Sequence, residues 1–67
     1  MGKNQQRIED LLIAIREHAL LSIFAEEIGD MQEAQLHEQS ARALHNELVQ
    51  ILLDEYQLNN YEPATHN

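Results

Sequence analysis

Two stretches of the chain repeat apolar residues at steps of three and four, which is the periodicity of amphipathic helices. The first stretch, residues 5–28, contains neither proline nor glycine. Its main apolar face consists of Ile8, Leu11, Leu12, Ile15, Ala19 and Ser22. The second stretch, residues 31–58, carries a heptad pattern on Ala34, His37, Ala41, Leu44, Leu48, Ile51, Glu55 and Leu58. We therefore expect two long helices, each with one face turned toward a neighbour.

A short segment between these stretches has the residues that end one helix and begin another. Gly29 is the residue type that most readily adopts the left-handed conformation just past a helix C-terminus. Asp30 and Glu33 follow with the Asp-x-x-Glu spacing of a capping box. With a turn of only residues 29–30, the simplest architecture is an all-α, antiparallel two-helix hairpin.

Folding the chain at this turn predicts which side chains face each other. Near the turn the expected layers pair small residues, such as Ala25 with Ala34, whereas Leu11 and Leu48 pair toward the open end. The helices should therefore approach closely at the turn and diverge away from it. Residues 1–4 are expected to be a polar lead-in, and residues 59–67, which include Pro63, a flexible tail.

Each predicted helix also carries apolar residues outside its main face. These residues are Ile13, Leu20, Phe24 and Ile28 in the first helix, with Val49, Leu53 and Tyr56 in the second. A helix that packs against a single neighbour needs only one apolar side. We therefore predict that the seven residues bind a partner, and that the hairpin is completed into a bundle by another protein or by a second copy.

Size and composition favour the same conclusion. A chain of 67 residues is one domain at most, and a core this small rarely stabilises a fold alone. The chain has no cysteine, so disulfides and thiolate metal sites are excluded. Its net charge of −8 disfavours binding to nucleic acid or to an anionic membrane surface. No apolar run approaches the length of a membrane span and no signal sequence is recognisable, so we expect a cytoplasmic protein.

The candidate catalytic or metal-binding residues are few. His18 and His37 fall in neighbouring layers with Ser22 close by, so a metal site or an acid–base site inside a bundle is conceivable. The Glu-x-x-His spacing of metal-binding bundles is absent, however, and Ser22 has no base beside it in the sequence. We therefore predict hydrogen-bonded or hydrated histidines, no metal, no cofactor and no enzymatic activity.

Residues around the turn resemble two known families. The stretch from Ala25 to Ala34, followed by Ala41, resembles the turn of a tetratricopeptide repeat, but such domains need about three copies and the chain has one. The stretch from Gly29 to Leu44, followed by further leucines and isoleucine, resembles the small helical-hairpin co-chaperones of type III secretion needle subunits. The matching features are Gly29, Gln35 and Arg42-Ala43-Leu44.

The second resemblance implies a cytoplasmic hairpin that binds a tetratricopeptide-like chaperone and helps it to mask an aggregation-prone needle subunit. The leading hypothesis is accordingly an adaptor or co-chaperone that covers an apolar surface of a partner. The alternative is a self-associating, Rop-like four-helix bundle with a regulatory role. A metal-dependent bundle enzyme, which would need His18 and His37 to bind a cation, is the third.

Overall fold

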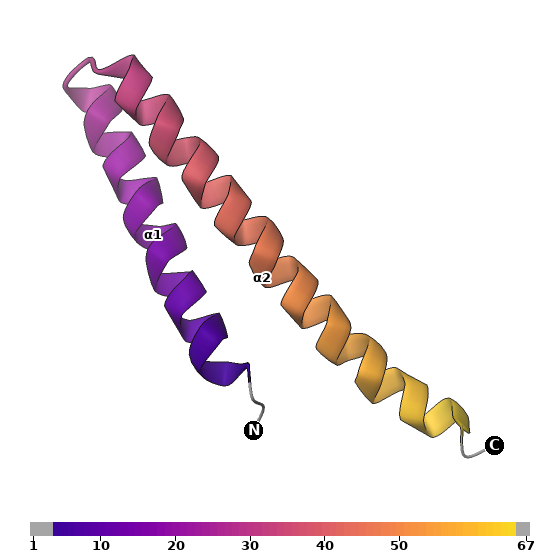
Figure 1. Ribbon diagram of the computed structural model, residues 1–67. Coiled ribbons are helices and arrows are strands. Elements are labelled where there is room, and N and C mark those ends of the chain that lie inside the picture. Colours follow the sequence, from indigo (N-terminus) through magenta and orange to yellow (C-terminus); the bar gives the residue numbers. More distant parts are fainter. Residues whose placement is uncertain (1–3, 66–67) are drawn as a thin grey trace.

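The computed structural model describes the backbone of residues 4–65 and the side chains of residues 4–57. It shows an all-α antiparallel hairpin of two helices, α1 (Gln5–Glu27) and α2 (Met31–Thr65), as Figure 1 shows. The molecule is a rod that measures 58 × 18 × 11 Å. The predicted fold class is confirmed.

The turn is built by hydrogen bonds that close the C-terminus of α1. Gly29 has a φ of 84°, the left-handed conformation predicted for it. Its N–H donates to the carbonyl of Glu26 at 3.0 Å, and the N–H of Asp30 donates to the carbonyl of Ala25 at 2.8 Å. These two bonds form a Schellman motif, which satisfies carbonyls that the helix itself leaves without donors.

Asp30 also begins α2. Its Oδ1 accepts a hydrogen bond from the N–H of Glu33 at 3.2 Å, which is one half of the predicted capping box. In the reciprocal half, the Glu33 carboxylate would accept from the N–H of Asp30, but that N–H already donates to Ala25. Because Asp30 serves two helices at once, the connection needs only three residues.

The core is a single line of side chains between the helices. The buried residues are Leu11 and Ala25 from α1 with Ala34 and Leu48 from α2. The predicted heptad positions of α2 from Ala34 to Glu55 are all buried or half-buried, as expected. Two positions assigned to the α1 face are wrong: Leu12 and Ala19 are exposed, because each lies about one-quarter turn beyond the core line.

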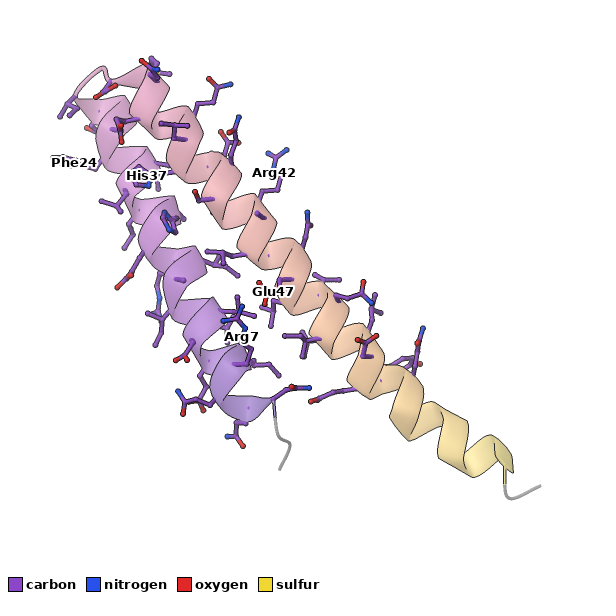
Figure 2. The ribbon with its side chains drawn as sticks, viewed as in Figure 1. Arg7, Phe24, His37, Arg42 and Glu47 are labelled. Carbon is purple, nitrogen blue, oxygen red and sulfur yellow. The ribbon has the colours of Figure 1, made fainter. Side chains whose placement is uncertain are left out.

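The helices are close at the turn and diverge toward the open end, as the layer sizes predict (Figure 1). Polar contacts join them at the open end. Asn4 Nδ2 donates to Glu55 Oε2 at 3.1 Å, and Arg7 forms an ion pair with Glu47, its Nε lying 3.0 Å from Glu47 Oε2 (Figure 2). Asn4 therefore uses its side chain to reach α2 rather than to cap α1.

The helix bounds differ from the predicted ones at their C-terminal ends. α1 ends at Glu27 rather than at Ile28, because Ile28 takes the C-cap position of the turn. α2 continues to Thr65, past the predicted end at Leu58 and through most of the predicted tail. Asparagine lowers helix propensity by less than about 1 kcal/mol per residue, so the pair that follows Leu58 does not force an end. Within the described residues, neither helix is both apolar and long enough to cross a bilayer.

Candidate protein-binding site

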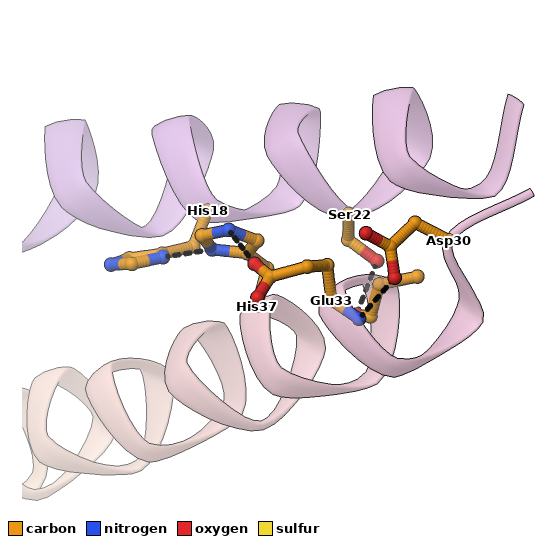
Figure 3. A network of polar contacts seen from close by, with 6 residues as sticks. His18, Ser22, Asp30, Glu33 and His37 are labelled. Carbon is orange, nitrogen blue, oxygen red and sulfur yellow. Dashed lines mark hydrogen bonds and ion pairs between the residues drawn. The ribbon is translucent and has the colours of Figure 1, made fainter. Parts of the chain in front are cut away.

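A small polar cluster lies between the helices near the turn (Figure 3). His18 Nδ1 and His37 Nδ1 are 3.0 Å apart, and the rings are tilted by 34°. His37 Nε2 lies 3.5 Å from Glu33 Oε1, one helical turn before it in α2. Ser22 Oγ donates to the carbonyl oxygen of Ala34 at 2.9 Å. The two histidines are therefore hydrogen-bonded to each other, which is one of the two states predicted for them, although the sequence pattern places them in neighbouring layers rather than in the same one.

The polar groups of this cluster are engaged with each other and with the backbone. The Ser22 hydroxyl is held by a backbone carbonyl, and the facing Nδ1 atoms of the two histidines are engaged with each other. Among the residues that the structure describes, no group of three or more His, Asp or Glu side chains is placed to hold a metal ion. The cluster therefore joins the two helices near the turn.

The seven predicted partner-binding residues all have exposed side chains. The most exposed of those in α1 are Phe24 at 62% and Leu20 at 60%, with Ile13 at 49%. Such exposure is unusual for so many large apolar residues in one small chain, because soluble monomers rarely leave large contiguous apolar patches uncovered.

Ile13, Leu20 and Phe24 form one surface, which we call the outer strip. With about 100° of rotation per residue, these positions lie on the side of α1 opposite its core line of Leu11, His18 and Ala25. Figure 2 shows Phe24 pointing away from α2. Ile28 follows at the turn and is also exposed. The acidic residues Glu9, Glu17 and Glu27 flank the outer strip on the same helix.

The three predicted residues of α2 do not join this surface. Val49, Leu53 and Tyr56 lie toward the open end of the hairpin, whereas Phe24 and Ile28 lie at the turn. Helical rotation also places Leu53 on the side of α2 away from α1. The structure thus divides the predicted set into two surfaces, so a single partner groove could not cover all seven residues at once.

A second apolar surface lies along one side of the hairpin. A shallow groove of about 310 Å³ is lined by Ile15, Glu38, Ala41, Arg42 and His45. Leu12, Ile23 and Leu52, which were not among the predicted partner-binding residues, are exposed at positions that follow core residues by one. The sequence signal for this surface is that an apolar residue repeatedly comes directly after a core position.

In comparisons with known proteins, no family model, no curated protein and no solved structure matches the chain. The resemblance to type III secretion co-chaperones therefore stays a prediction from sequence.

Proposed function

We propose that this protein is a non-enzymatic, protein-binding helical hairpin, an adaptor or co-chaperone that covers an apolar surface of a partner protein. The observation that carries the proposal is the outer strip, in which Phe24, Leu20 and Ile13 are exposed on the side of α1 that α2 does not contact. Aromatic and aliphatic anchors of this kind supply most of the binding energy in helix-in-groove complexes.

Charge indicates the kind of partner. The outer strip is flanked by Glu9, Glu17 and Glu27, and the chain as a whole carries a net charge of −8. A complementary surface is an apolar groove with lysine or arginine at its rim, because opposite charges at the rim speed association and orient the complex. A helical groove of the tetratricopeptide type, which the sequence resemblance implies, is the form of partner that we propose.

Site-specific photocrosslinking in the native host tests this proposal. A photoreactive phenylalanine analogue at position 24 should capture a discrete partner, which mass spectrometry then identifies. The matched control carries the same analogue at Leu36, which is 50% exposed but lies on α2 away from the outer strip. Equal capture from both positions, or from neither, would contradict the proposal.

The captured partner then allows a quantitative test. Phe24→Ala should weaken its affinity by about 2 kcal/mol or more, the loss typical of a central anchor. Leu36→Ala should change the affinity by less than about 0.5 kcal/mol, as expected for a residue outside the interface. For the co-chaperone role, adding the hairpin should also reduce light scattering by the aggregating partner, and the Phe24→Ala variant should do so less well.

A further inference from the structure

The shallow groove lies on one of two very different sides of the hairpin. In a helix, the residue after a core position lies about 100° to one side of it and the residue before lies about 100° to the other. Because the helices are antiparallel, the residues that follow core positions in α1 and in α2 share one side. By the same geometry, residues that precede core positions share the opposite side. The ion pair of Arg7 with Glu47 confirms this, because the two residues come directly before core positions in α1 and α2 and contact each other.

The side that contains the groove, which we call the grooved face, is apolar and carries little net charge. Leu12, Ile23, Val49 and Leu52 lie on it and are exposed at 38–55%. Its charged residues are three acids, Glu9, Glu26 and Glu38, and two bases, Arg16 and Arg42, of which Glu9 and both arginines lie at its margins. Glu38 and Arg42 are paired with each other at 3.1 Å.

The opposite side is strongly acidic. It carries the carboxylates of Asp10, Glu17, Glu33, Glu47 and Asp54 against the single arginine Arg7. Two copies that met through this side would bring like charges together, which is destabilising. Two copies that met through their grooved faces would keep these carboxylates in solvent.

The hairpin exposes more surface than a compact chain of its size. A compact monomer of 7.8 kDa exposes about 4,400 Å². This chain exposes 5461 Å², which is roughly 1,000 Å² more. Part of this excess belongs to the rod shape, in which α2 is longer than α1, and a standard protein–protein interface removes about 800 Å² from each partner.

We propose that the grooved face binds a second copy of this chain, and that the pair forms a four-helix bundle. A two-fold axis presents the same surface from both copies, so an apolar face with little net charge suits self-association better than the acidic side does. The outer strip lies on a different side of α1 and stays available in the pair. The dimer is therefore additional to the proposed partner binding and does not depend on it.

Light scattering on the purified full chain at micromolar concentration tests the dimer. The expected mass is twice the 7.8 kDa of one chain. Leu12→Glu and Leu52→Glu should weaken self-association by about 100-fold or more, because each would bury an unpaired charge. Leu36→Glu and Leu21→Glu are matched controls that should leave the mass unchanged, because these residues lie outside the grooved face. Their exposed fractions, 50% for Leu36 and 45% for Leu21, are close to the 49% of Leu12 and the 46% of Leu52.

A second measurement avoids the risk that a charged variant unfolds. In methyl NMR spectra of the unmodified chain, the signals of Leu12, Ile23, Val49 and Leu52 should shift with protein concentration, and those of Leu21 and Leu36 should not. Phe24→Ala should leave the dimer mass unchanged, which separates this proposal from the proposed function. A monomeric chain at all concentrations, or concentration-dependent shifts on the acidic side instead, would overturn the grooved face as the dimer interface.

Discussion

His18 and His37 contact each other across the two helices through the same ring atom, with their Nδ1 nitrogens 3.0 Å apart. A hydrogen bond at this distance needs one donor and one acceptor, so the two rings cannot be in the same tautomeric state. The carboxylate of Glu33 breaks the symmetry, because its Oε1 lies 3.5 Å from Nε2 of His37 and favours a proton there. His37 then accepts at Nδ1, and His18 donates from Nδ1.

We therefore predict opposite neutral tautomers for the two histidines. At alkaline pH, long-range proton–nitrogen NMR spectra should show His18 with its proton on Nδ1 and His37 with its proton on Nε2. His45, which lies outside this pair, is the internal reference for an exposed ring. Identical tautomers at positions 18 and 37 would contradict the hydrogen bond.

Replacing the histidines one at a time and together should give non-additive effects. Either His18→Leu or His37→Leu leaves one half-buried ring without its partner and should lower the free energy of unfolding by about 1 kcal/mol. The double replacement removes both polar groups and should be close to neutral, or stabilising. Chemical denaturation of the unmodified chain, the two single variants and the double variant, followed by circular dichroism, measures the coupling free energy between the two histidines. Additive losses would mean that the rings do not stabilise each other.

Gly29→Ala should destabilise the hairpin through the backbone alone. A methyl group at this position would meet nothing within 4 Å, so there is no clash to relieve. The φ of 84° is nevertheless unfavourable for alanine and should lower the free energy of unfolding by roughly 1–2 kcal/mol. Gly29→Asn is the control, because asparagine tolerates the left-handed region better and should cost less. Equal losses for the two variants in thermal melts would show that φ is not the cause.

Leu11 and Leu21 provide a paired test of the core in one helix. Leu11 is 1% exposed and Leu21 is 45% exposed. Leu11→Ala should lower the free energy of unfolding by about 2–5 kcal/mol, which approaches the whole stability of a core this small. Leu21→Ala should change it by less than about 0.5 kcal/mol. The helical signal at room temperature should therefore fall sharply for the first variant only.

Much of the fold could be predicted from local sequence signals. Gly29 and Asp30 mark the turn because few residue types suit their conformations, and the heptad of α2 identifies its core line down to Glu55. The error at Leu12 and Ala19 has a physical cause. An apolar residue about 100° from the core line satisfies the same three- and four-residue spacing as a core residue, so periodicity alone does not separate the two.

The binding surfaces were harder to predict for a different reason. Phe24, Leu20 and Ile13 could be assigned to a second side of α1 from their spacing. Whether Val49 and Leu53 lie beside them depends on the axial position and the rotation of α2, which the residue pattern within α2 does not contain. His18 pairs with His37 because the two helices are shifted along their axes by one layer relative to the simplest matching. This shift depends on how side chains interdigitate between the helices, so the pattern within either helix alone does not contain it.

The three-residue connection between Glu27 and Met31 fixes the rotational phase of one helix relative to the other. Inserting a single residue there would turn the whole of α2 by about 100° about its axis. Each α2 side chain that now lies in the interface would be replaced by the one before it, so that Glu33 and Glu47 would take the places of Ala34 and Leu48. Surface turns commonly tolerate changes in length, but this one should be intolerant of insertion, because a single added codon would turn carboxylates inward along the entire rod.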